Sequence, residues 1–404
     1  MRARSCLALA AVAAVGAGTL AGCSADPGET PDVSIYVFGY DSGMDQWVED
    51  TTAAFDDLDL GYSLDITVVP PNDLQQTLTT RLQGGTPPDI TSAPTAWIPA
   101  YADSLRDLST ILSPDLAEGF APTVEEQATF DDRLVAAPYG TSTRALYYNK
   151  DLFAAAGIDE PPATWDELIS DAQAVKASSG LDAGIGVQGT GNETFAAWFP
   201  YVYWSFGGDF GTGDTIELDP DACLSGLEVL DDIVRGSAVS QPNPTSSDLT
   251  DIQDSFASGQ TAMTISGPWL LGSLGDLSAG VAPIPAGSTQ STLAVADAWT
   301  SFAGSTASDE QVGQVLDFLL SSDVEIPFLQ GRGFLPSLER DFTDPAFQGE
   351  EFAPFVQALD TAKFAPLSDQ WAQFQVTGES AMQSLYVGDQ TPEQVCATLA
   401  DSLT

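Results

Sequence analysis

The segment from Pro138 to Leu168 constrains the fold more tightly than any other part of this 404-residue chain. Residues 145–149 (Ala-Leu-Tyr-Tyr-Asn) predict a strand, and the short helix expected after them ends at Gly157, because glycine is common at helix C-termini. Two prolines at 161–162 then prevent any helical continuation. Thr164 and Glu167 have the spacing of a capping box. The segment therefore predicts a strand, a short helix and a second helix in succession.

Strands and helices alternate along the rest of the chain. The order predicts βαβ units and an α/β fold with mostly parallel sheets. Because one hydrophobic core rarely organises a chain of this length, two lobes are expected. The segments that carry this prediction are strands at 33–38, 64–69 and 262–265, and helices at 73–83, 252–257 and from the capping residues 308–311 to Leu320.

The N-terminus resembles a bacterial lipoprotein signal. Arg2 and Arg4 precede a short apolar run, and Leu-Ala-Gly-Cys ends at Cys23. We therefore expect residues 1–22 to be a signal peptide that is removed, Cys23 to be lipidated, and residues 23–32 to be a flexible tether. The alternative, an uncleaved membrane helix, is disfavoured because the run is short and rich in Ala and Gly, whereas a span needs roughly 20 strongly apolar residues.

The chain is very acidic, with 12 basic and 58 acidic residues and a formal net charge of −46. Such a surface repels nucleic acid and anionic lipid headgroups, so no nucleic-acid partner is expected. It suits a salty or acidic exterior. Adaptation to salt is an open hypothesis, which good folding in low salt would contradict.

The chain contains no histidine, which excludes a Ser-His-Asp triad, a His-activated cysteine and a His-ligated zinc ion. Cys223 and Cys396 each lie in an apolar helical stripe and are expected to face inward. A disulfide between them is favoured over two buried free thiols for an exported chain. The acids between Asp209 and Asp221 lack the spacing of a calcium loop. No metal and no cofactor are therefore expected.

The segment 138–168 closely resembles the domain-crossing segment of the sugar-binding proteins of bacterial ABC importers, the maltose-binding-protein type of extracellular solute-binding protein family 1. Residues 256–269 (Phe-Ala-Ser-Gly-Gln-Thr-Ala-Met-Thr-Ile-Ser-Gly-Pro-Trp) resemble the second signature of this family. The segments 281–285 and 331–336 and the helix after Thr391 follow in the same order as in the family.

This resemblance implies a two-lobed periplasmic-binding-protein-like fold whose hinge the chain crosses about three times. The crossings are expected near Thr141 to Thr143, near Leu293 and near Leu338. The N-terminal lobe would then comprise 33–141 plus 293–338, and the C-terminal lobe 142–292 plus 339–404.

Aromatic residues are candidates for a sugar site because a pyranose offers apolar C–H faces to their rings. The resemblance implies that Trp269 stacks on the ligand, and that Trp371 corresponds to a late tryptophan of the same site. Trp97 lies in the loop after Asp89-Ile90, and Trp299 follows Asp297-Ala298, where the chain would return to the first lobe. Trp198 lies in an aromatic cluster of the second lobe. Each could instead be a core residue, and for Tyr203 and Trp204 the core is the favoured assignment.

Polar candidates are the groups that could bind hydroxyls. Tyr40 and Asp41 follow the first strand, at the sheet edge where such folds bind ligands, and Asp297 precedes Trp299. Glu193 resembles a sugar-binding position of the family. Ser142 stands where the maltose-binding type has a ligand-contacting glutamate, which argues against maltose. Arg144 could bind a sugar or a carboxylate, or could brace the hinge through an ion pair.

Together these features predict the substrate-binding component of an ABC importer. It would be a lipid-anchored monomer on the outer face of the membrane that captures a carbohydrate, expected to be an oligosaccharide, without chemistry of its own. A secreted glycoside hydrolase is the alternative from another class, because paired acids beside aromatics could support cleavage. Within the binding class, a polyol, a phosphorylated polyol and an oligopeptide remain open. A neutral sugar is favoured because basic residues are scarce.

Overall fold

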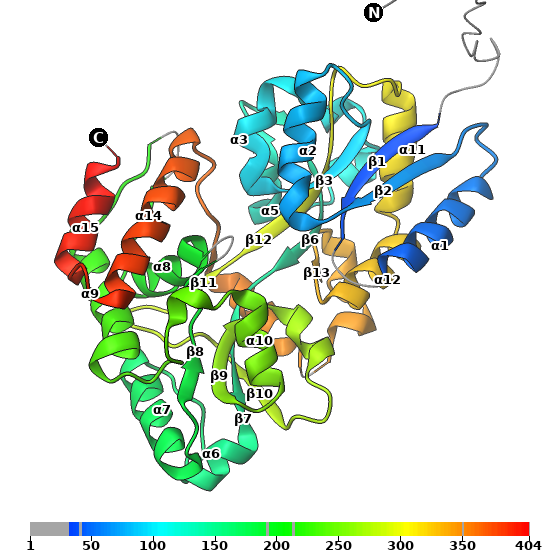
Figure 1. Cartoon of the computed structure of the whole chain (residues 1–404). Helices are drawn as coiled ribbons and strands as arrows, with labels where there is room; N and C mark the ends of the chain where they lie inside the picture. Colours follow the sequence, from blue (N-terminus) through cyan, green and yellow to red (C-terminus); the bar gives the residue numbers. More distant parts are fainter. Residues whose placement is uncertain (1–31, 40–42, 191–193, 212–214, 350, 404) are drawn as a thin grey trace, which may run out of the picture.

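Two sheets, each beside its own hydrophobic core, divide the molecule into two lobes (Figure 1). The computed structural model describes residues 32–39, 43–190, 194–211, 215–349 and 351–403. The first lobe contains a six-stranded sheet of order β13-β6-β12-β3-β1-β2, and the second a four-stranded sheet of order β10-β7-β9-β8. The strands of the two sheets are β1 Val33–Phe38, β2 Leu64–Val69, β3 Ile90–Pro94, β6 Ala137–Ser142, β7 Ala145–Asn149, β8 Ala183–Gly186, β9 Thr261–Ser266, β10 Ala279–Ala282, β12 Val295–Ser301 and β13 Leu335–Pro336.

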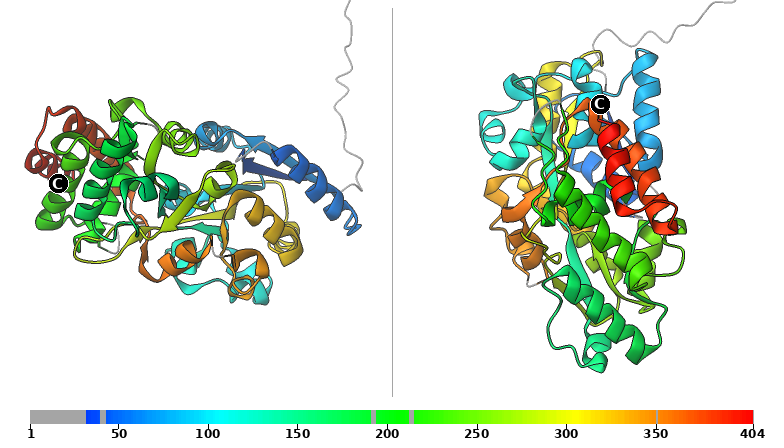
Figure 2. Two further views of the ribbon diagram at one scale, coloured as in Figure 1. Left: turned by 90° about the horizontal axis from the view of Figure 1, so that it is seen from below. Right: turned by 90° about the vertical axis from the view of Figure 1, so that its left-hand side faces the viewer.

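Helices cover both sheets, and the two lobes lie end to end, with α1 far from α14 and α15 (Figure 2). The α-helices are α1 Met44–Asp56, α2 Pro71–Gln83, α3 Ile98–Tyr101, α4 Pro114–Ala117, α5 Pro122–Ala128, α6 Lys150–Ala156, α7 Trp165–Ser179, α8 Thr194–Ser205, α9 Pro220–Asp231, α10 Leu249–Ala257, α11 Asp309–Leu319, α12 Ser322–Arg332, α13 Ala353–Ala358, α14 Asp369–Val387 and α15 Pro392–Asp401. Shorter elements are the strand pairs β4 Thr129–Phe130 with β5 Arg133–Leu134 and β11 Thr292–Leu293 with β14 Ala362–Lys363, the 3₁₀ turns η1 Thr95–Trp97, η2 Ala102–Ser104, η3 Leu108–Thr110, η5 Pro244–Ser246, η6 Pro268–Ser273, η7 Glu339–Asp341, η8 Pro345–Phe347 and η9 Leu359–Thr361, and the π-turn η4 Asp232–Gly236.

Local sequence signals determine the predicted helix ends. Gly157 ends α6 with φ of 75°, a left-handed conformation that glycine adopts without strain. Thr164 and Glu167 form the predicted capping box of α7, and Ser308 and Gln311 form another at the start of α11. The predicted strands 33–38 and 64–69 are confirmed as β1 and β2, which pair in parallel.

The α/β class and the two-lobed architecture are confirmed, but the prediction of mostly parallel sheets is wrong. β1 pairs in parallel with β2 and β3, whereas β12 runs antiparallel to both β3 and β6. In the second lobe, β7 is antiparallel to β9 and β10, and only β8 with β9 is a parallel pair. The difference arises because one strand of each sheet enters from the other lobe and not through a βαβ crossover. These strands, β12 in the first sheet and β7 in the second, make the antiparallel pairs with β3, β6, β9 and β10.

The chain passes between the lobes at two of the predicted places. β6 of the first sheet leads through Thr143 and Arg144 into β7 of the second, and Leu293 in the second core is followed by β12 in the first sheet. The third passage lies further along the chain than Leu338, because Leu338 and Phe347 both pack in the first core. The predicted boundary at residue 339 would place Phe347 in the other lobe.

A third, smaller hydrophobic cluster lies between the two large cores. Its buried members are Ala145, Tyr147, Phe256, Leu270, Leu335 and Phe355, which come from both sheets and from α10, η6 and α13. Because this cluster contains Leu335 of the first sheet and Tyr147 of the second, it packs the hinge strands together. We call it the hinge cluster.

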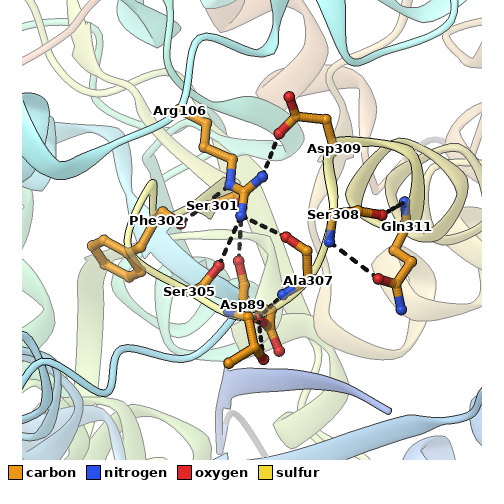
Figure 3. A network of polar contacts seen from close by, with 10 residues as sticks. Asp89, Arg106, Ser301, Phe302, Ser305, Ala307, Ser308, Asp309 and Gln311 are labelled. Carbon is orange, nitrogen blue, oxygen red and sulfur yellow. Dashed lines mark hydrogen bonds and ion pairs between the residues drawn. The ribbon is translucent and has the colours of Figure 1, made fainter. Parts of the chain in front are cut away.

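Asp89, before β3, fixes the loop that leads into α11 (Figure 3). Its carboxylate accepts hydrogen bonds from Ser34 N and Oγ at 2.9 and 2.7 Å and from Ala307 N at 2.7 Å. Burial alone would raise the pKa of Asp89, but these bonds and those from Thr306 outweigh it and lower the pKa. Arg106 binds the same loop through Phe302 O and Ala307 O.

A disulfide joins Cys223 of α9 to Cys396 of α15. Both helices pack on the core of the second lobe, as their apolar stripes predict. Among the described residues, none of the helices combines the length and apolar character that crossing a bilayer requires.

Candidate functional site

Arg144 and Trp269, two residues singled out in the sequence, lie against each other at the first passage between the lobes. The guanidinium carbon of Arg144 is 4.6 Å from the centroid of the Trp269 ring, a cation–π contact. Arg144 lies directly before β7 and is only 8% exposed, whereas Trp269 in η6 is half-buried. The pair therefore places an indole and a guanidinium side by side at the hinge.

Three neighbours position Trp269. Tyr147 of the hinge cluster donates a hydrogen bond of 2.8 Å to the carbonyl of Gly267. Gly267 lies so close to the indole that a Cβ there would be 2.2 Å from the ring. A Cβ at Gly333, which follows α12 of the first lobe, would be 2.6 Å from the backbone nitrogen of Trp269. Glycine at 267 and 333 thus permits a close approach that no side chain would allow.

Burial raises the pKa of Tyr147 well above its ordinary value, although the charge of Arg144 acts in the opposite direction. The hydroxyl consequently stays protonated at neutral pH and remains a hydrogen-bond donor to Gly267. Its bond ties η6 to strand β7, which carries Arg144 at its start.

Ser142 and Thr292 complete the polar surroundings of Arg144. Nη1 of Arg144 donates to Ser142 Oγ at 3.0 Å and makes a longer contact of 3.5 Å with Thr143 O. The hydroxyl of Thr292 accepts from Arg144 N at 3.2 Å and donates to Arg144 O at 2.8 Å. Thr292 lies in β11, so it joins the first and second passages of the chain.

A second group of candidates lies at the carboxyl edge of the first sheet. The Trp97 ring meets the ring of Phe38, the last residue of β1, edge-on at 5.6 Å. Asp297 is buried at an irregularity of β12, opposite Pro94 at the end of β3. Trp97 contacts the end of β1, and Asp297 of β12 lies opposite the end of β3. Both residues therefore lie at the carboxyl edge of these two parallel strands. Tyr40 and Asp41 follow β1 in the sequence and lie outside the described residues, as do Glu193 and Cys23.

Three other tryptophan candidates are core residues. Trp299 is 2% exposed and packs on Tyr139 with ring centroids 4.8 Å apart. Trp198 and Trp371 are 2% and 4% exposed in the second core, where Trp371 contacts Phe210. We assign all three to packing, because each indole lies among the side chains of a hydrophobic core. Tyr203 and Trp204 are also buried in the second core, as predicted.

Sequence reasoning did not identify Thr292, Tyr147 and Gly333 as members of the site. Thr292 directly precedes Leu293, where a hinge passage was predicted, so its place could have been found. The contact of Gly333 with Trp269 could not, because it depends on how the lobes meet. No group of three or more potential metal ligands occurs in the described part of the chain, and the acidic loop there contributes Asp209 to an ion pair with Lys363 at 2.7 Å.

Comparison with known proteins identifies the family. Residues 40–326 match the family model of the bacterial extracellular solute-binding proteins. A putative binding protein of Brucella abortus is 33% identical over 404 residues, which covers 96% of this chain and 98% of the relative. The chain belongs to the bacterial extracellular solute-binding protein family. A further relative, the sn-glycerol-3-phosphate-binding periplasmic protein UgpB of Brucella melitensis, is 28% identical over 51% of this chain and 49% of its own length.

Solved structures of solute-binding proteins share the whole fold. Maltose-bound MalE3 of T. maritima superposes with a TM-score of 0.83, covering 93% of this chain and 99% of its own at 21% identity. The GacH receptor of Streptomyces glaucescens, solved without ligand and with acarbose, gives a TM-score of 0.81 at 21% identity, covering 92% and 97%. As an extracellular solute-binding protein, the chain acts outside the cytoplasm and has a binding role and not an enzymatic one.

Proposed function

We propose that the chain is the substrate-binding component of an ABC importer and captures a carbohydrate, expected to be an oligosaccharide, where its two lobes meet. The observation that carries this proposal is the half-buried indole of Trp269 beside the guanidinium of Arg144 at the hinge. An aromatic ring and hydrogen-bond donors are the two kinds of group that a pyranose needs. The ligands of the two similar structures, maltose in MalE3 and acarbose in the GacH receptor, support the same class of solute.

The proposed site combines groups from both lobes. Trp269, Arg144 and Ser142 lie at the hinge, and Trp97 and Asp297 lie at the edge of the first sheet. Tyr40, Asp41 and Glu193 are proposed as further contacts on sequence grounds alone. A ligand that touches both lobes favours a closed arrangement over an open one, so binding shifts the population toward closure.

The lobe boundaries and the attachment to the membrane are part of this proposal. The expected lobes are 33–141 plus 293–338 and 142–292 plus 339–404, and we propose that the last boundary lies beyond Phe347, which packs in the first core. Residues 1–22 are proposed as a signal peptide, Cys23 as the lipidated residue and 23–32 as the tether. A monomer held in this way would deliver its solute to the membrane permease.

Lipidation predicts a simple change in partitioning. The full chain, expressed in a bacterium that processes lipoproteins, is expected to enter the detergent phase of a Triton X-114 extraction, whereas Cys23→Ser is expected in the aqueous phase. Equal partitioning of the two proteins would overturn the anchor and leave the binding function untouched.

The function itself is tested by a calorimetric screen of mono- and oligosaccharides, with glycerol, glycerol 3-phosphate and short peptides as the competing ligand classes. Chromatography of each sugar after incubation tests the hydrolase alternative. Tight binding of a sugar that remains intact is the expected result. Sugar cleavage would replace the proposed function with the hydrolase. Tight binding of glycerol 3-phosphate alone would overturn the carbohydrate and favour the solute that the UgpB relative is named for.

A further inference from the structure

Arg144 is a buried cation without an acidic partner in the described part of the chain. Only 8% of the residue is exposed. The ion pairs of the described residues involve Arg106, Arg235, Arg340 and Lys363, and none involves Arg144. Burying a charge is costly unless an opposite charge or several hydrogen bonds offset the loss of water.

The guanidinium of Arg144 has N–H groups that donate no hydrogen bond to any described residue. It carries five N–H groups, and every hydrogen bond that it donates to a described residue comes from Nη1. Nε and Nη2 have no hydrogen-bond partner among the described residues. Because the group lies over the ring of Trp269, a ligand that reaches the indole also meets the guanidinium.

Among the described residues, no ion pair braces the hinge through the side chain of Arg144. An ion pair across the hinge would need a carboxylate within reach, and the described residues supply none. Thr292 makes the link between the first two passages through the backbone of Arg144, to N and to O. A different residue at position 144 would retain both of these bonds.

We propose that Arg144 is the specificity residue of the site and binds an anionic group on the carbohydrate, either a carboxylate or a phosphate. This inference rests on the proposed function and departs from the neutral sugar that the scarcity of basic residues favours. The planar guanidinium matches the oxygens of both anions with two parallel hydrogen bonds. In a chain with a net charge of −46, a cation without an acidic neighbour is the group able to offset the repulsion of an anion.

The test uses matched pairs of compounds that differ only in the acid. Calorimetric titrations compare glucuronate with glucose, digalacturonate with galactobiose, and glucose 6-phosphate with glucose. At least one acidic member is expected to bind the wild-type protein about 10-fold or more tightly than its neutral partner, the range of one charged hydrogen-bonded pair. The uronate and phosphate pairs distinguish the two sources of the anion.

Variants connect this preference to Arg144. Arg144→Gln is expected to bind both members of the preferred pair equally, and Arg144→Lys, which keeps the charge without the planar fork, to retain part of the preference. Thermal unfolding of each variant checks folding. Should Arg144→Gln not fold, the wild-type titrations and Arg144→Lys still decide the question.

Equal or tighter binding of the neutral members by the wild type would overturn the inference and leave the proposed carbohydrate binding standing. An acid preference that persists in Arg144→Gln would overturn the role of Arg144. Absence of binding to every sugar, neutral or acidic, would overturn the proposed function itself.

Discussion

At the scale of single residues, Glu325 of α12 is the buried acid with the least support. Glu325 is 1% exposed, and neither of its carboxylate oxygens, Oε1 and Oε2, has a hydrogen-bond partner in the described part of the chain. Asp341 itself accepts from Ser322 Oγ at 2.6 Å and pairs with Arg340 at 3.3 Å. Burial raises the pKa of Glu325 well above its ordinary value; the Asp341 carboxylate adds to this effect and Arg340 opposes it. A protonated Glu325 can share its proton with Asp341.

This arrangement predicts that stability falls as pH rises. The folded protein keeps a proton that the unfolded chain releases above pH ~4.3, so the contribution is full below that pH and is lost as pH rises through the folded-state pKa. The free energy of unfolding is expected to fall by up to about 1.4 kcal/mol per pH unit through this group. Glu325→Gln, whose amide can donate to Asp341 at any pH, is expected to remove that part of the slope.

Chemical denaturation between pH 4.5 and 8 measures the slope in both proteins. Glu126→Gln is the control, because Glu126 is exposed on α5 and should leave the slope unchanged. Parallel pH profiles for the wild type and Glu325→Gln would contradict the assignment of the proton.

Several residues of the candidate site could be predicted from the sequence, but the contacts between them could not. Trp269, Arg144 and Ser142 were each predicted separately, from resemblance and from the scarcity of basic residues. Their mutual contact was not predictable, because it depends on how η6 packs against the start of β7. The sequence cannot distinguish Trp269 from Trp299 either, since apolar neighbours surround a ligand-stacking tryptophan and a core tryptophan alike.

At the scale of elements, close packing explains a glycine pattern that could be mistaken for a nucleotide motif. Residues 184–189 match G-x-G-x-x-G, yet Gly184 lies in β8, which faces α7. A Cβ at Gly184 would be 2.6 Å from Cβ of Ala172 and 2.7 Å from its carbonyl oxygen. A Cβ at Gly189 would be 2.4 Å from the carbonyl oxygen of Pro244. Gly184 therefore lets α7 approach β8, and Gly189 lets η5 approach the segment after β8.

Gly184→Ala is therefore expected to lower the free energy of unfolding by about 1–3 kcal/mol, because α7 must move away from β8. Gly331→Ala in α12 is the matched control. Nothing lies within 4 Å of its Cβ position, so the substitution is expected to be neutral or to stabilise the helix by up to about 1 kcal/mol. Equal effects of the two substitutions in urea denaturation would contradict the packing argument.

Elements were predictable where neighbouring residues determine them. The end of α6, the start of α7 and the limits of β1 and β2 follow from caps and short apolar runs, which are local. Strand direction was not predictable in the same way. The antiparallel pairing of β12 with β3 and β6 joins segments that are distant in the sequence and that meet only because the chain returns across the hinge.

At the scale of the whole molecule, the disulfide between Cys223 and Cys396 links parts of the chain that are 173 residues apart. It ties the last helix of the described chain to α9 in the second lobe. The closed loop restricts the unfolded chain, so its loss is expected to cost about 2–5 kcal/mol of unfolding free energy.

Denaturation with and without reductant measures this cost, and the double variant Cys223→Ser/Cys396→Ser provides the control. Reductant is expected to lower the unfolding midpoint of the wild type and to leave that of the double variant unchanged. Intact mass spectrometry that finds two free thiols in the secreted protein would contradict the bond.

We expect the solute to be held where the two lobes meet, around Trp269. A calorimetric titration of the wild type and of Trp269→Ala with the tightest-binding sugar of the screen tests it most directly. We expect one binding site per wild-type chain and an affinity at least about 10-fold weaker in Trp269→Ala, measured at a temperature where thermal unfolding shows both proteins to be folded. Unchanged affinity in a folded Trp269→Ala variant would contradict the claim.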